Sequence, residues 1–173
     1  MNNWYMVTVV GQDRAGIVAH VTAAFYEGGC NLGAASMMRL GGNFAIMLMV
    51  QYDGPLKSLR ELVAPVVESM DLHLHVDRIE GRLHDHLVPD VRISVFGADR
   101  AGIVAKVTTA LSEAGLHILN LESDVGGTAE RPLYIMHIEG QAREGIEALR
   151  SALAAAKEEG IETRLDPIET LMG

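Results

Sequence analysis

A seven-residue segment occurs twice in this chain without a single change, and this repeat constrains the fold more than any other feature. Asp13–Ala19 reads DRAGIVA, and the same letters return at Asp99–Ala105, 86 positions later. At that offset five further residues match: Val21, Thr22, Glu27, Gly29 and Gly54 with Val107, Thr108, Glu113, Gly115 and Gly140. Such a repeat indicates two copies of one structural unit, so we expect the 173 residues to form two small domains.

Both halves carry the same order of strand-like and helix-like segments. After the repeated turn, Ile17, Val21 and Phe25 lie at helical spacing, which predicts an amphipathic helix, and the second half repeats this pattern. We expect strands at residues 4–10, 31–40, 44–52 and 72–79, and again at 91–96, 117–125, 133–139 and 161–168. Second helices are expected at 56–70 and 142–159, and hairpin turns at Gly41–Gly42 and Gly126–Gly127.

The order βαββαβ, found twice, predicts the α+β class with two ferredoxin-like domains in tandem. We place the first domain at residues 1–82, a polar linker at 83–89 and the second domain at 90–173. In this fold both helices cover one face of an antiparallel sheet, and the other face needs cover of its own. The two sheets can meet face to face, or their edge strands can pair to form one longer sheet, and the sequence leaves both arrangements open.

The charge of the chain argues against direct contact with nucleic acid. Fourteen Lys and Arg residues stand against 23 Asp and Glu residues, which gives a formal net charge of -9. An acidic protein is repelled by phosphate backbones. No basic recognition helix is evident either, so any effect on transcription is expected to pass through a protein partner.

The remaining composition indicates a cytoplasmic protein. The single cysteine, Cys30, has no partner for an internal disulfide and is expected to be a small buried core residue. The first residues lack the layout of a signal peptide, and no apolar run has the length of a membrane-spanning helix. We therefore expect no association with a membrane.

The turn Asp-Arg-Ala-Gly, followed by an apolar helix, by Gly-Cys-Asn-Leu at residues 29–32 and by a glycine hairpin, resembles the ACT domain family of small-molecule regulatory modules. Both halves resemble it, and together they cover nearly the whole chain. A tandem pair without an attached enzyme is most similar to the glycine cleavage system transcriptional repressor family. That family usually has Pro where this chain has Ala15 and Ala101, a change that keeps the helical geometry.

The repeated turn has the chemistry to bind a free amino acid. The first amides of a helix lack partners and lie at the positive end of its dipole, so a carboxylate can dock there. Gly16 and Gly102 allow close approach to the backbone, and Asp13 and Asp99 can accept hydrogen bonds from an ammonium group. As the alternative, these two aspartates simply cap their helices.

The resemblance adds further residues to this candidate site. In amino-acid-binding ACT domains the residues of this turn, here including Ala15 and Ala101, face an Asn at the start of the second strand of another domain. By resemblance Asn31 takes that place in the first half, and His117 stands there in the second. Asn31 can instead serve only the turn between helix and strand.

No metal-binding or catalytic chemistry is expected. Four histidines, His73, His75, His84 and His86, lie close together in sequence, but alternating polar residues on an exposed strand give the same pattern without a metal. No phosphate-binding loop, nucleophile elbow or His-Glu-x-x-His motif occurs. We therefore predict no catalytic residue, no metal and no cofactor.

The function predicted from the sequence is a non-catalytic regulatory protein. An amino acid, with glycine and serine as candidates, is expected to bind at an interface between ACT-like units and to change how they associate. The exposed sheet face and edges favour a homodimer, and the output is expected to pass to a regulatory protein partner. The alternatives are a ligand-free interaction module and a detached regulatory subunit of an amino-acid enzyme.

Overall fold

The computed structural model describes residues 3–80, 87–98, 102–158 and 160–168. The chain divides into two compact units, Met1–Asp85 (unit 1) and His86–Gly173 (unit 2), each of which is described by itself. The predicted linker, residues 83–89, lies partly outside the described residues.

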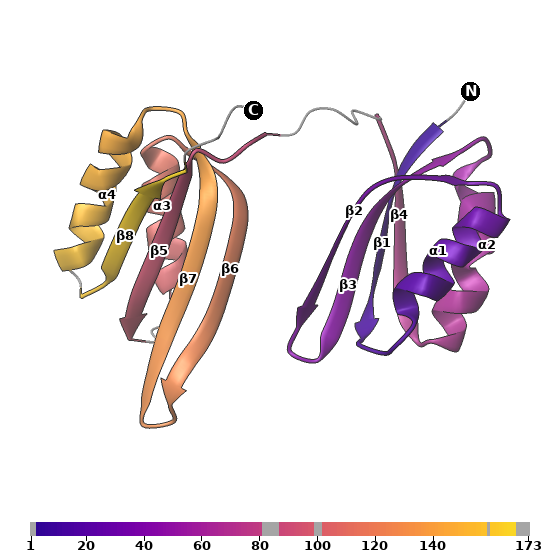
Figure 1. The fold of residues 1–173 in the computed structure, drawn as a ribbon, viewed down its shortest axis with the longest axis horizontal. Helices are drawn as coiled ribbons and strands as arrows, with labels where there is room; N and C mark the ends of the chain where they lie inside the picture. The colour runs from indigo at the N-terminus through magenta and orange to yellow at the C-terminus, as the bar shows by residue number, and fades with distance from the viewer. Residues whose placement is uncertain (1–2, 81–86, 99–101, 159, 169–173) are drawn as a thin grey trace. The chain divides into compact units, whose positions relative to one another are not determined.

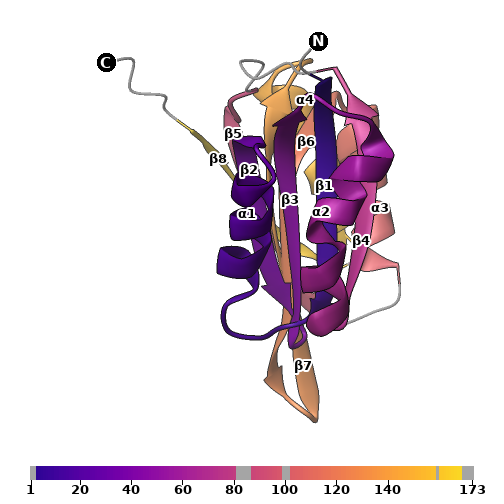
Figure 2. The same ribbon diagram turned by 90° about the vertical axis from the view of Figure 1, so that its right-hand side faces the viewer.

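Unit 1 contains four strands and two helices in the order βαββαβ (Figure 1). They are β1 (Asn3–Gln12), α1 (Ile17–Glu27), β2 (Asn31–Leu40), β3 (Asn43–Tyr52), α2 (Leu56–Ser69) and β4 (Leu72–Ile79). The strands form one antiparallel sheet in the order β2-β3-β1-β4. Both helices lie side by side on one face of this sheet (Figure 2).

Unit 2 repeats this topology. Its elements are β5 (Val91–Ala98), α3 (Ile103–Glu113), β6 (Leu116–Thr128), β7 (Arg131–Ala142), α4 (Ile146–Glu158) and β8 (Glu162–Pro167). The antiparallel sheet has the order β6-β7-β5-β8. The predicted fold class, two ferredoxin-like α+β domains in tandem, is confirmed.

Each core lies between the sheet and its two helices. Alternate residues of a strand point to opposite faces, and residues three or four apart share one face of a helix, so these two periods select the buried side chains. In unit 1 the central residues of the core are Tyr5, Val7, Val9, Ile17, Val21, Phe25, Leu59 and Val63. In unit 2 they are Val91, Ile93, Val95, Ile103, Val107, Leu111, Leu149 and Leu153.

The hairpin of unit 2 differs from the prediction. Gly126 and Gly127 are not its turn, because they lie within β6 and face Leu133 and Pro132 of β7. The turn falls instead at residues 129–130, so the hairpin is longer than in unit 1.

The longer hairpin changes which residues of the two units are equivalent. Val7 faces Leu48 in unit 1, whereas its equivalent Ile93 faces Ile138 in unit 2. The offset between equivalent residues is therefore 86 before the hairpin and 90 after it. The match of Gly54 with Gly140 in the sequence is accordingly wrong, since these two residues occupy different places.

The start of α4 also differs from the prediction. The second helix of unit 2 begins at Ile146 and not at residue 142, because Ala142 is the last residue of β7 and Gly145, with a φ of 87°, makes the turn between them. No helix in the described part of the chain is long and apolar enough to cross a membrane.

Candidate functional site

The repeated turn of unit 1 connects the end of β1 to the start of α1. The backbone N–H of Asp13 donates to the carbonyl of Gly42 at 3.0 Å, which fixes the turn beside the β2–β3 hairpin. Gly16 is the N-cap residue of α1 and has a φ of 89°, in the left-handed region that favours glycine. Ala15 and Gly16 are exposed, so the first amides of α1 lie at the surface.

Asp13 does not cap α1. The helix has no side-chain cap at its N-terminus, and the Asp13 carboxylate instead accepts from the guanidinium of Arg39 at 2.6 Å. Arg39 comes from the end of β2, and its side chain is 69% exposed, while that of Asp13 is only 24% exposed. The capping alternative is therefore wrong for Asp13, which belongs to an ion pair at the rim of the turn.

His20 lies over the same turn. Its Nδ1 is 2.7 Å from the carbonyl oxygen of Gly16, and a Cβ added to Gly16 would lie 3.0 Å from the His20 ring. Glycine at position 16 is thus favoured both by its backbone conformation and by the nearby ring. The turn combines an anion, a cation, an imidazole and helix amides within one exposed surface.

The corresponding turn of unit 2 has different neighbours. Gly102 is again the N-cap residue, with a φ of 86°, and it is exposed. Asp99 and Ala101 lie outside the described residues. Lys106 stands at the place of His20, and the apolar Val125 at the place of Arg39. The two turns therefore carry different side chains and are not chemically equivalent.

Asn31 and His117 lie at the starts of the two equivalent strands. Asn31 is exposed and stands opposite Gln51, and His117 is half-buried opposite Gln141. Arg39 is at the other end of β2, on the order of 25 Å from Asn31 at about 3.3 Å per residue. A single unit does not bring Asn31 to its own Asp13 turn, so a shared site would need a facing unit.

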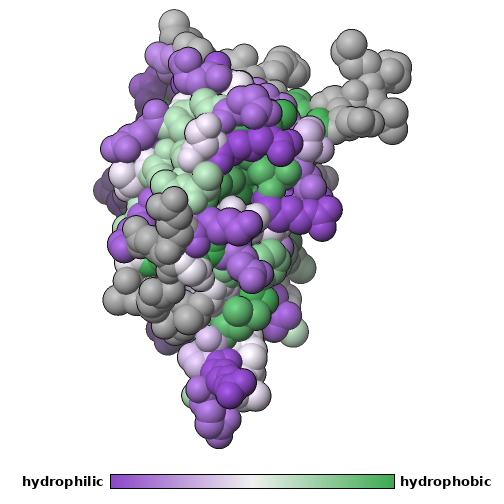
Figure 3. Space-filling model, turned by 90° about the vertical axis from the view of Figure 1, so that its left-hand side faces the viewer, coloured by the Kyte–Doolittle hydropathy of each residue, from purple (hydrophilic) through white to green (hydrophobic). Residues whose placement is uncertain are grey.

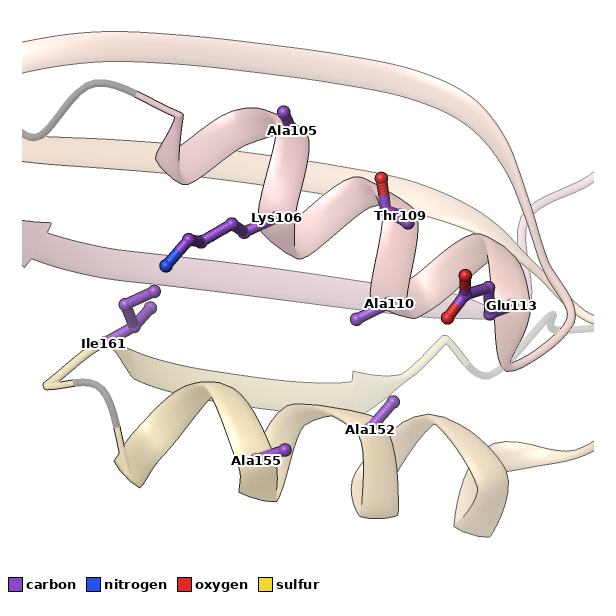
Figure 4. A pocket seen from close by; sticks show the side chains of 8 residues that line it. All are labelled: Ala105, Lys106, Thr109, Ala110, Glu113, Ala152, Ala155 and Ile161. Atoms are coloured by element: carbon purple, nitrogen blue, oxygen red, sulfur yellow. The ribbon is translucent and has the colours of Figure 1, made fainter.

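A groove lies between α3 and α4 of unit 2, away from the predicted residues. It has a volume of about 480 Å³ and is lined by Ala105, Lys106, Thr109, Ala110, Glu113, Ala152, Ala155 and Ile161. Figure 4 shows Lys106 and Glu113 near its two ends, with Ala110, Ala152 and Ala155 between them. Figure 3, viewed from the side of these helices, shows apolar patches among polar side chains.

One of the two histidines of β4 pairs with a carboxylate. His73 and His75 are exposed, and His75 Nε2 lies 2.8 Å from Asp77 Oδ2. In the ranges that the structure describes, no three His, Cys, Asp or Glu side chains are placed to hold a metal ion. His84 and His86 lie outside those ranges.

Cys30 is buried, as predicted, with 8% of its surface exposed. Burial raises the pKa of its thiol above the ordinary value, because an apolar environment disfavours the thiolate. A thiol in this state is a poor nucleophile, which agrees with a role in packing.

Arg39 and His20 are the two residues of the turn that the sequence prediction missed. Arg39 is distant from Asp13 in sequence, but the strand order places the ends of β1 and β2 at the same end of the sheet. Arg39 can be placed beside Asp13 only when the strand order of the sheet is known, because no local sequence pattern relates the two residues. His20 would have followed from its helical spacing, one turn after Gly16.

The two βαββαβ units, each with a glycine turn before its first helix, define a tandem protein of the ferredoxin-like α+β class. Residues 4–77 and 90–166 each match the family model of the ACT domain. The chain therefore belongs to the ACT domain family. No curated protein matches it significantly.

Two crystal structures are similar over the whole chain. The first, an unknown protein from Galdieria sulphuraria, has a TM-score of 0.74 and 25% identity, and the match covers 98% of this chain and 100% of the other. The second, a candidate glycine cleavage system transcriptional repressor, has a TM-score of 0.71 and 18% identity, with 98% and 99% covered. The second likeness supports the fold and not a shared ligand.

Proposed function

We propose that this protein is a non-catalytic cytoplasmic regulator that binds a small amino acid, with glycine and serine as candidates, at the Asp13 turn. The site is completed by a facing ACT unit that presents Asn31, and the copies are expected to form a homodimer. Ligand binding favours the associated arrangement, because a site shared by two units exists only when they are together.

The Asp13–Arg39 ion pair is the observation that carries this proposal. An amino acid is a zwitterion, and this pair offers an anion for its ammonium group and a cation for its carboxylate. The amides of the first turn of α1 supply further donors for a carboxylate. Gly16 leaves the backbone accessible to a ligand, since it has no side chain and is exposed.

The side chains of unit 2 support a different role for the second turn. Val125 cannot attract a carboxylate as Arg39 does, and His117 replaces Asn31. We therefore expect unit 1 to contribute the main amino-acid site. Asp99, Ala101 and Gly102 form the second candidate turn, with weaker affinity expected.

The output is proposed to be a change in association with a regulatory protein, and through it an indirect effect on genes of amino-acid metabolism. The net charge of -9 favours a protein partner over direct contact with DNA. A ligand that changes partner affinity typically contributes about 1 to 3 kcal/mol of coupling. An interface site is suited to this size of effect because only a few contacts need to form.

The test is thermal unfolding of the full chain with each common amino acid in millimolar excess. A ligand at about 100 times its Kd stabilises the folded state by roughly 2.7 kcal/mol, which raises Tm by several degrees. Glycinamide, which lacks the carboxylate, and acetate, which lacks the ammonium group, are expected to give no shift.

Variants connect the ligand to the turn. Asp13→Asn, Arg39→Leu and Asn31→Ala are expected to remove the shift, while Arg92→Leu, which breaks an exposed ion pair in unit 2, is the matched control and keeps it. A shift that survives both Asp13→Asn and Arg39→Leu would place the ligand elsewhere. No shift with any amino acid would favour the ligand-free interaction module or a detached regulatory subunit.

A further inference from the structure

The helix-free face of the unit 1 sheet is apolar at its centre. Val7 and its neighbours Tyr5 and Val9 point toward the helices, so the alternate residues of β1 point to the opposite face. The strand register places the following residues on this face, here called the methionine face: Met6, Thr8, Val10, Met38, Met47 and Met49.

The methionine face carries no charged side chain on its three strands β2, β3 and β1. Exposed fractions of 40% for Val10, 61% for Met38 and 48% for Met47 show that these apolar side chains reach the surface. Charge begins only at the edge strand β4, with Asp77 beside His75. Methionine is flexible and polarisable, so such a surface adapts readily to an apolar partner.

Four of the same positions in unit 2 carry polar side chains that pair across the strands, whereas Val10 is replaced by the apolar Phe96. Met6 and Met49 face each other in unit 1, and their equivalents in unit 2 are Arg92 and Glu139, which form an ion pair at 2.6 Å. A second cross-strand pair changes in the same way.

That second pair is Thr8 and Met47. It is replaced in unit 2 by Ser94 and His137, whose Oγ and Nδ1 atoms are 3.1 Å apart. The edge strand β8 adds Arg164, which pairs with Asp166 at 2.8 Å.

These differences decide what can cover the methionine face. Covering Arg92 and Glu139 with methionine side chains would remove an ion pair from water without giving it new hydrogen-bond partners, and such desolvation costs free energy. The sheet face of unit 2 is therefore a poor match for the methionine face. A second methionine face is a good one, because it is apolar and has the same twist.

We propose that the methionine face is the dimer interface, in which unit 1 of one copy packs on unit 1 of a second copy around a two-fold axis. Such a contact is isologous, so each copy buries the same residues. It leaves the β2 edge and the Asp13 turn free, so the facing ACT unit that completes the amino-acid site would belong to a second, separate contact. This inference is independent of the amino-acid site, and a chain that binds no amino acid would still form this dimer.

The size of the face is sufficient for a specific contact. The three strands of this face, about 4.8 Å apart and about eight residues long, span roughly 380 Å² in flat projection. Protruding side chains make the accessible surface larger than this projection. The result is of the order of the roughly 800 Å² that each partner contributes to a standard interface.

The experiment measures the mass of the full chain by light scattering over a range of protein concentrations. Without added amino acid we expect a species of twice 18.7 kDa for the wild type. Met47→Lys places a charge at the centre of the face, on a strand between β2 and β1, and is expected to weaken the dimer roughly tenfold or more. Tyr26→Lys, at an 80% exposed apolar residue of α1, is the control and keeps the dimer.

Two results would overturn the proposal. One is a wild-type chain that stays monomeric at high micromolar concentration. The other is a Met47→Lys dimer as stable as the wild type, since a dimer formed by pairing strand edges would not involve Met47. Far-UV circular dichroism checks that the variant is folded, and Met38→Lys, at a 61% exposed residue of β2, provides a second variant with the same expected result.

Discussion

The side chain of Leu62 in α2 occupies the space that a side chain at Gly28, the residue that ends α1, would need. A Cβ added to Gly28 would lie 2.5 Å from Leu62 Cδ1 and 2.9 Å from Cδ2, so the absence of a side chain at position 28 allows the two helices to approach. In unit 2 the equivalent residues are Ala114 and Ala152. The contact between Gly28 and Leu62 in unit 1 is thus replaced by a pair of alanines in unit 2. One of them, Ala152, lines the groove between α3 and α4.

This relationship predicts a non-additive pair of substitutions. Gly28 has a φ of -77°, which alanine adopts easily, so Gly28→Ala is expected to cost about 1 to 2 kcal/mol through the clash with Leu62 alone. In the double variant with Leu62→Ala, which recreates the alanine pair of unit 2, the cost of Gly28→Ala is expected to disappear.

The measurement is the free energy of unfolding from urea titration. Trp4 is the single tryptophan of the chain and lies in β1, so its fluorescence reports on unit 1. Costs that simply add in the double variant would contradict the proposed contact.

The two N-cap glycines provide a matched comparison. Gly16→Ala and Gly102→Ala both force alanine into a left-handed conformation, at φ values of 89° and 86°, and each is expected to cost about 1 to 2 kcal/mol. At Gly16 the new Cβ would meet the His20 ring at 3.0 Å, whereas at Gly102 it would have none of the described residues within 4 Å.

Gly16→Ala is therefore expected to cost less in a His20→Ala background than in the wild type, by several tenths of a kcal/mol. Trp4 fluorescence during urea unfolding measures this difference. Hydrogen exchange of the α3 amides measures the effect of Gly102→Ala, which should not depend on His20. Equal costs for Gly16→Ala in both backgrounds would show that the ring moves aside freely.

The fold was largely predictable from the sequence because the repeat and the apolar periods are local signals. The β2 boundaries, Asn31 to Leu40, follow directly from such signals. The β6–β7 hairpin was not predicted correctly, since Gly126 and Gly127 look like a turn but pair within the ladder. The cross-strand register decides which glycines form the hairpin turn. The register in turn depends on contacts between residues that are distant in the sequence.

The candidate site was predictable only in part. The glycine at each N-cap and the turn at Asp13 follow from the DRAGIVA repeat. Arg39 could not be found from local pattern, because its position beside Asp13 depends on the strand order of the sheet. The contrast between the methionine face and the sheet face of unit 2 could not be predicted from the sequence either. Because the β6–β7 hairpin is longer, Glu139 is the equivalent of Met49, and this is known only from the cross-strand register.

The buried thiol predicts a loss of stability at high pH. Burial raises the pKa of Cys30 in the folded state, so the unfolded chain releases this proton at a lower pH than the folded chain. The contribution of the thiol to stability is complete below the pKa of the unfolded state and is lost as the pH rises toward the folded pKa.

From about pH 7 to about pH 10, the free energy of unfolding of the wild type is therefore expected to fall relative to Cys30→Ala, by at most about 1.4 kcal/mol per pH unit. Urea titration followed by Trp4 fluorescence measures both proteins at each pH. Parallel pH profiles would show that the thiolate is as well solvated in the folded chain as in the unfolded one.

The last prediction concerns the ion pair that distinguishes unit 2 from unit 1. Arg92→Met or Glu139→Met alone is expected to cost about 0.5 to 1 kcal/mol, since the pair is partly exposed, at 57% and 27%. The double variant recreates the Met6–Met49 pair of unit 1 and is expected to be within about 0.5 kcal/mol of the wild type, because two apolar side chains facing each other across strands restore a favourable contact.

The double variant should also change association, because it removes one ion pair from the sheet face of unit 2 and makes that face more apolar. We expect light scattering to show species larger than the wild-type dimer, whereas Arg164→Met with Asp166→Met, a control at the sheet edge, should have a smaller effect. Far-UV circular dichroism and urea titration of each variant separate association from unfolding. If the Arg92–Glu139 double variant loses more stability than the two single variants together, the two sheet faces are not interchangeable and the ion pair is required for the fold of unit 2.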